Sequence, residues 1–137
     1  PLFFDLVWPA SPAVCALVAV SVLCSVLISF SWRFLVNVSA LWTVDAYGMG
    51  RVAFMAVLLL SGFIVPVTYY PDWLRRVVEL TPFPAMVNTP IEIYLGMPSG
   101  TPLMQALAVQ VFWVVALALA ARAVYARGVA RLVVQGG

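Results

Sequence analysis

The sequence predicts an all-α fold: a polytopic membrane helix bundle with three transmembrane helices and a Pro-rich external re-entrant helical hairpin. Of the 137 residues, 65% are hydrophobic and only 9% are charged, whereas a soluble domain carries roughly 25% charged residues. Uncharged runs at 6–32, 52–71 and 93–121 each reach the about 20 residues that a membrane-crossing helix needs. Residues 53–60 and 114–121 are apolar on every side, which favours helices over the alternating strands of a membrane barrel.

The first span is expected at about 13–34. Pro12 suits the first turn of this helix, where a missing backbone N–H leaves no hydrogen bond unmade. A stripe of small polar residues with a spacing of four runs down one face: Ser21, Ser25 and Ser29. Such a stripe allows close packing of helices in lipid. The alternative interpretation is that these serines line a substrate path.

A short polar and aromatic connection joins the first two spans and contains Asp45. Asp45 is expected to cap a turn or a helix. The alternatives are an ion pair with Arg33 or Arg51, which flank the connection, or contact with a partner subunit. The second span is expected at about 51–68, and Pro66 should bend or end it because proline breaks the helical hydrogen-bond ladder.

The segment 69–101 is predicted to form the external insert. It contains two expected short helices, Trp73–Leu80 with Asp72 as its cap, and about 85–95. Both are too short to span a bilayer, so they suit interfacial or re-entrant helices that protein or water must cover. Prolines punctuate the segment and its border: Pro71, Pro82, Pro84, Pro90, Pro98 and Pro102.

Glu92 lies in a largely apolar part of this insert. A carboxylate is costly in such surroundings unless it is paired. We therefore expect Glu92 either to act in a gate or ion pair with Arg75 or Arg76, or to be exposed at the membrane interface.

The third span is expected at about 102–125 and contains Gln105 and Gln110. A separation of five residues places them about 140° apart around a helix, so they cannot both face one narrow path. Hydrogen bonding between helices is the default expectation for each, and a role in a path or gate is the alternative.

The charges predict the orientation of the chain. Three arginines with no acid nearby follow the third span: Arg122, Arg127 and Arg131. This pattern is typical of a cytoplasmic end. The carboxyl terminus and the 35–50 connection are therefore predicted inside, and residues 1–12 and the 69–101 insert outside. Arg33 and Arg51 agree with this orientation, whereas Arg75 and Arg76 do not, although neighbouring acids offset them.

The composition also excludes several classes of function. There is no Lys and no His, which removes the phosphate-binding P-loop and the commonest general base and metal ligand. Cys15 and Cys24 lie in one hydrophobic run and are interpreted as packing residues. A net charge of +2 is too small for a nucleic-acid surface. We expect no catalytic residue, metal, cofactor or nucleic-acid partner.

Several segments resemble one known family. Leu41-Trp42-Thr43-Val44-Asp45 is similar to the Phe-Trp-Thr-Val-Asp element of bacterial type-2 ABC export permeases. The stretch 66–74 resembles that family's Pro-Leu-x-x-Phe-Pro-x-Trp-Leu pattern. Pro82-Phe83, the segment 89–96 and the closing 131–137 follow in the family's order. The resemblance covers 37–137 by motif and 1–36 by hydropathy.

The resemblance implies a permease subunit of an ATP-binding cassette exporter in the bacterial inner membrane. Members have about six spans, so residues 1–137 are expected to form a single transmembrane domain, the C-terminal half. It would dimerise with a second permease copy or a homologous permease and dock on a separate ATPase subunit. The path or gate candidates are Ser21, Ser25, Ser29, Glu92, Gln105 and Gln110, and the cytoplasmic-side pairing candidates are Arg33, Asp45 and Arg51. The alternative is a non-transport membrane anchor or assembly subunit.

Overall fold

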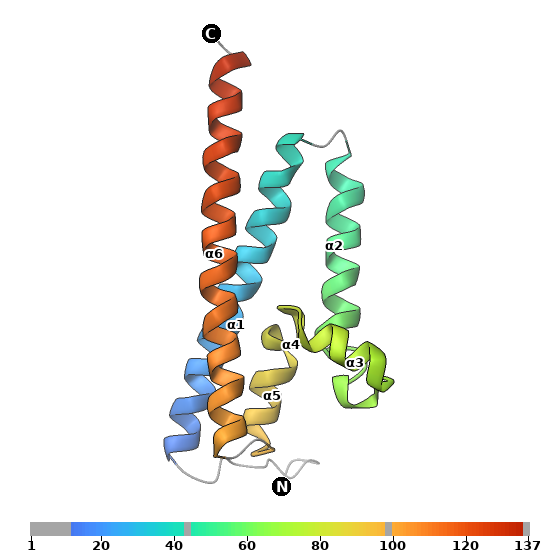
Figure 1. The fold of residues 1–137 in the computed structure, drawn as a ribbon, viewed down its shortest axis with the longest axis vertical. Helices are drawn as coiled ribbons and strands as arrows, with labels where there is room; N and C mark the ends of the chain where they lie inside the picture. Colours follow the sequence, from blue (N-terminus) through green and yellow to red (C-terminus); the bar gives the residue numbers. More distant parts are fainter. Residues whose placement is uncertain (1–11, 43–44, 98–99, 136–137) are drawn as a thin grey trace, which may run out of the picture.

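The structure, a computed structural model, describes residues 12–42, 45–97 and 100–135, except the side chains of 40 and 130–135. Every regular element in these ranges is helical, which confirms the all-α prediction for the described chain (Figure 1). The predicted outer segment 1–12, apart from Pro12, and the Thr43–Val44 part of the family motif lie outside the described residues. The elements are α1 (Pro12–Ser39), η1 (Ala40–Trp42), α2 (Ala46–Leu60), η2 (Val67–Tyr69), α3 (Asp72–Glu79), α4 (Phe83–Met86), α5 (Asn88–Tyr94) and α6 (Thr101–Gln135).

Two long helices, α1 and α6, form the frame of the molecule. They contain 28 and 35 residues and extend past the spans predicted at 13–34 and 102–125. Both are long and apolar enough to cross a membrane. They make the most extensive contact between helices in the structure, and Figure 1 shows α6 continuing beyond the end of α1 toward the carboxyl terminus.

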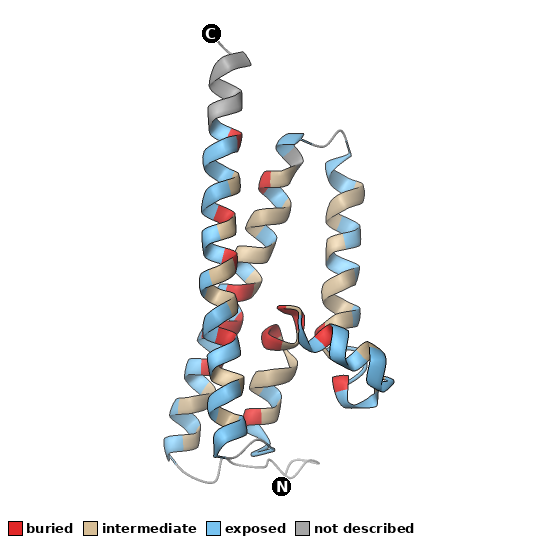
Figure 2. Cartoon of the chain, in the orientation of Figure 1, coloured by how far each residue is buried: buried red, intermediate tan, exposed pale blue. Residues whose placement is uncertain are grey.

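The outer surfaces of α1 and α6 are apolar. Phe30 and Leu23 on α1 are 67% and 60% exposed, and Phe112 and Leu119 on α6 are 60% and 62% exposed. Figure 2 shows that exposed residues run along almost the whole of both helices. A helix of a soluble protein buries its large apolar residues, whereas a lipid-facing helix presents them outward. These surfaces suit a bilayer.

The second predicted span, 51–68, has different helical limits in the structure. The helix α2 begins earlier, at Ala46, and ends at Leu60. Its 15 residues rise about 22 Å, which is less than the hydrocarbon core of about 30 Å. A third complete crossing stays a prediction, and it needs the irregular segment 61–66 in addition to α2.

A glycine turn ends α2, rather than the proline that the sequence indicated. Gly62 has a φ of +84°, a left-handed conformation that favours glycine. The preceding Ser61 carbonyl accepts a hydrogen bond from the backbone N–H of Asn88 (3.2 Å). This contact directs the chain toward the insert before Pro66 is reached.

The insert contains three short helices in place of the two expected. Asp72 is the first residue of α3 and not its cap, because Pro71 precedes the helix without a side-chain hydrogen bond. The expected helix 85–95 begins at Phe83 and breaks at Val87 into α4 and α5. Pro90 explains the break, since its nitrogen cannot donate to the carbonyl four residues earlier and its ring clashes with that carbonyl.

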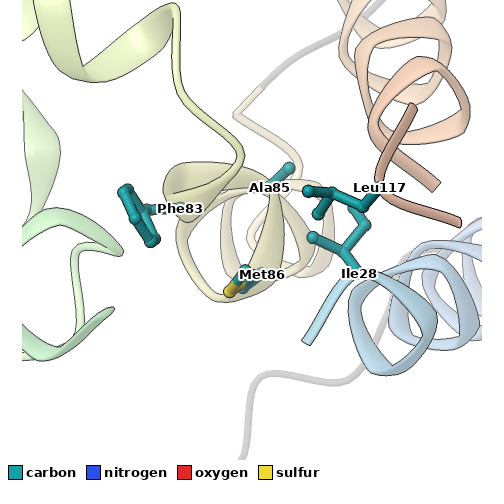
Figure 3. Packing of buried hydrophobic residues seen from close by; sticks show 5 residues of the cluster. All are labelled: Ile28, Phe83, Ala85, Met86 and Leu117. Atoms are coloured by element: carbon teal, nitrogen blue, oxygen red, sulfur yellow. The ribbon is translucent and has the colours of Figure 1, made fainter. Parts of the chain in front are cut away.

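The core lies where α4 packs between α1 and α6. The buried apolar cluster consists of Ile28, Phe83, Ala85, Met86 and Leu117. Figure 3 shows Ile28 and Leu117 approaching Ala85, while Phe83 lies on the opposite side of α4. Phe83 also meets the Trp32 ring edge to face, with 5.1 Å between the centroids. The core therefore attaches the insert to both long helices.

The left-handed conformation at position 62 predicts that any residue other than glycine there lowers the stability of the protein. In Gly62→Ala a Cβ is forced into left-handed backbone and within 3.0 Å of the Asn88 side chain, so we expect a loss of roughly 1–2 kcal/mol of stability. The control is Gly50→Ala within α2, where no atom lies within 4 Å and a gain of about 0.5–1 kcal/mol is expected. Thermal unfolding in detergent measures both, and equal unfolding temperatures for the two variants contradict the assignment.

Candidate functional site

A buried polar cluster joins three helices at the level of the core. It consists of the side chains of Ser21, Ser25 and Gln110 and the backbone carbonyl of Ala85. The Ser21 hydroxyl donates to Gln110 Oε1 (2.8 Å), and Gln110 Nε2 donates to the Ala85 carbonyl oxygen (2.9 Å). The Ser25 hydroxyl lies 3.0 Å from the same carbonyl oxygen. Ser21 and Gln110 are completely buried and Ser25 nearly so.

The position of this cluster follows from the backbone of α4. A helix of only four residues leaves its last carbonyls without donors inside the helix. An unsatisfied carbonyl in an apolar interior costs several kcal/mol. Gln110 from α6 and Ser25 from α1 supply donors to Ala85, so they hold the insert against both long helices.

The two glutamines of α6 have different surroundings, as their separation around the helix requires. Gln110 is buried in the polar cluster, whereas Gln105 is exposed and lines a different cavity. The sequence gives no sign that Ala85 belongs to this cluster. An alanine carries no polar side chain, and the acceptor in question is a main-chain oxygen present at every position.

The three serines of the stripe on α1 differ in their burial and contacts. Ser21 and Ser25 take part in the polar cluster, whereas Ser29 is only partly buried. Ser25 and Ser29 also line a groove of about 700 Å³ between α1 and the α4–α5 segment, here called the α1–α5 groove. Its remaining lining residues are Val18, Val22, Val26, Phe30, Arg33, Met86, Val87, Pro90, Ile91 and Tyr94.

A second, more polar cavity of about 450 Å³ lies between the insert and the beginning of α6. It is lined by Glu92 and Gln105 together with Arg75 and Glu79. Arg75 pairs with Glu79 (2.7 Å) and not with Glu92, for which an ion pair with Arg75 or Arg76 was one of the expected alternatives. The hydrogen bond and the charge of Glu79 raise the pKa of Arg75 above its ordinary value. Glu92 nevertheless shares a cavity with this pair.

The three candidates for cytoplasmic-side pairing do not form ion pairs with one another. The Asp45 carboxylate accepts a hydrogen bond from the backbone N–H of Gly48 (2.8 Å) and caps α2. Arg33 lines the α1–α5 groove, and Arg51 lines a separate cavity beside Tyr47. Among the described residues the ion pair is Arg75–Glu79.

Neither a metal site nor a disulfide is present in the described part of the chain. No group of three or more His, Cys, Asp or Glu residues lies close enough there to hold an ion. Cys15 and Cys24 are free thiols, one exposed and one buried. The polar contacts of these residues are therefore hydrogen bonds and the Arg75–Glu79 ion pair.

Two long helices that expose large apolar side chains are typical of a helical integral membrane protein. A protein-family model described as ABC-2 family transporter protein matches residues 4–136. The chain belongs to the ABC-2 transporter family, a family of membrane permeases of ABC transport, which confirms the resemblance seen in its motifs. A search of curated proteins and a search of solved structures each found no match.

The glutamine pair provides a matched test of the polar cluster. Gln110→Leu removes a donor from the buried Ala85 carbonyl, so we expect a loss of about 1–3 kcal/mol of stability. Gln105→Leu changes an exposed residue of the same helix and should have little effect. Thermal unfolding in detergent measures both variants. Equal unfolding temperatures would show that the cluster does not hold α4.

Asp45 provides a test that separates capping from charge. Asp45→Asn retains a capping oxygen, whereas Asp45→Ala removes it and should cost about 1 kcal/mol. If capping is the role of Asp45, the Asn variant unfolds at the wild-type temperature and the Ala variant at a lower one. Equal destabilisation of both variants would instead point to an electrostatic role.

Proposed function

We propose that this chain is the permease subunit of an ATP-binding cassette exporter and forms part of the translocation path, while a separate subunit hydrolyses ATP. The observation that carries the proposal is the family match over residues 4–136. Residues 1–137 contain no lysine and so hold no phosphate-binding P-loop of their own, because that loop requires a lysine. The partners in this proposal are the ATPase and a second permease copy or a homologous permease.

The proposed topology is a single transmembrane domain that forms the C-terminal half of a six-span permease in the bacterial inner membrane. The carboxyl terminus is cytoplasmic in this proposal, and 69–101 is an external re-entrant hairpin. The distribution of charge supports this orientation. Figure 1 shows α5 near the start of α6, at the end of the molecule opposite the carboxyl terminus. Arg122 and Arg127 belong to the later part of α6.

The proposed path uses the α1–α5 groove and the polar cavity on the other side of the insert. Ser25, Ser29 and Arg33 contribute to the groove, and Glu92 and Gln105 contribute to the cavity. Ser21 and Gln110 act as structural residues in this scheme, because their polar atoms are already occupied within the polar cluster. A gate between the two spaces would require movement of α4 and α5.

Co-purification and coupled hydrolysis test the proposal. We expect the full-length permease to co-purify with an ATP-binding subunit encoded beside it. In vesicles, the ATPase activity of that subunit should depend on the permease. The control is an ATPase subunit whose phosphate-binding lysine is replaced, which should still bind the permease but should not hydrolyse ATP. If the ATPase is equally active with and without the permease, the proposal is wrong and the anchor or assembly alternative is favoured.

A further inference from the structure

The α1–α5 groove has an uneven distribution of polarity along its length. Its walls are mostly valine, isoleucine, methionine and proline side chains, and the charged residue in its lining is Arg33. Along α1 the lining runs from Val18 to Arg33, an interval that rises about 22 Å. The groove is therefore long, open and apolar, with a cation at one end.

Arg33 is exposed, and no described acid forms an ion pair with it. Asp45, the nearest acid along the sequence, is engaged as the cap of α2. A guanidinium beside lipid is costly unless it reaches an anion or the aqueous interface. It is also well suited to bind a carboxylate or phosphate through two parallel hydrogen bonds.

We propose that the α1–α5 groove binds an anionic amphiphile, with its hydrocarbon chain along the apolar walls and its carboxylate or phosphate at Arg33. The groove volume of about 700 Å³ lies within the roughly 300–1,000 Å³ of small-molecule sites. The Ser29 hydroxyl, four residues from Arg33 and in the same lining, adds a donor near the anion. The inference rests on the proposed function and assigns the substrate class of the permease.

Other ligand classes fit this groove less well. An organic cation would meet Arg33 without a carboxylate to balance its own charge, since the described residues of the lining include no Asp or Glu. An uncharged hydrocarbon would cover the apolar walls but leave Arg33 without an anion. In the proposed orientation Arg33 lies toward the cytoplasmic side, so the amphiphile enters from the inner leaflet.

The test uses a photoreactive long-chain fatty acid and its methyl ester, which share one hydrocarbon chain and differ in charge. Each probe is added to the full-length permease–ATPase complex in phosphatidylcholine vesicles, and labelled peptides are identified by mass spectrometry. We expect the acid to label α1 and α5 more strongly than the ester. Arg33→Gln should reduce labelling by the acid about fivefold, the effect of one basic residue on an anionic lipid. Arg33→Lys keeps the charge but not the paired guanidinium donors, so it should restore only part of the labelling.

Arg122→Gln is the matched control for charge. Arg122 is exposed and lies at the depth of Arg33, because Tyr125 one turn away packs on Phe34 with 6.0 Å between the ring centroids. Arg122 does not line the groove, so this variant should label like the wild type. An equal decrease in the Arg33 and Arg122 variants would overturn the site, because it would indicate attraction to the whole surface.

A steric pair provides a second and independent measurement. Val26→Trp fills the groove and should reduce labelling by the acid, whereas Leu23→Trp changes an exposed residue outside the groove and should not. The acid should also stimulate ATP hydrolysis in the wild type but not in Val26→Trp. If the acid and the ester label equally, or if Val26→Trp labels like the wild type, the proposed binding site is wrong. If labelling is selective for the acid but the acid does not stimulate ATP hydrolysis, the substrate assignment is wrong. If instead the proposed function is wrong, ATP hydrolysis will not depend on the permease, while the labelling pattern can still be as expected.

Discussion

The carbonyl oxygen of Ala85 is the group on which the packing of the insert depends. It lies at the end of a helix too short to satisfy its own backbone, in a protein whose surroundings are largely apolar. The Gln110 amide and the Ser25 hydroxyl supply the donors from two different helices. Because these groups are buried, no water can replace them at low cost. One backbone acceptor thus fixes α4 relative to α1 and α6.

Placement of the insert creates two spaces of different character. One side of the α4–α5 segment faces α1 and forms the apolar groove that contains Arg33. Another side faces the start of α6 and forms the polar cavity that contains Glu92. The break at Val87 contributes to the groove directly, since Val87 and Pro90 are part of its lining. The break between α4 and α5 therefore contributes two residues to the wall of the α1–α5 groove.

The end of α2 could not be predicted from the sequence. Pro66 was the visible helix breaker, yet α2 ends at Leu60 because Gly62 adopts a left-handed conformation and Ser61 bonds to Asn88. That hydrogen bond joins residues 27 positions apart, so no local pattern indicated it. Arg75 shows the opposite case, because its partner Glu79 lies four residues away on the same helix, a local spacing that the sequence does contain.

The sequence by itself determined that the chain is helical and membrane-embedded, because hydropathy and helix periodicity are local properties of neighbouring residues. It also determined the family, whose motifs occur in order along the chain. Only the tertiary structure decided which polar residues pack and which face open space. Ser21 and Gln110 meet across 89 positions of sequence, and Gln105, on the same helix, remains exposed. Such contacts depend on how α1, α4 and α6 are placed together, and the spacing of residues within one helix carries no information about its neighbours.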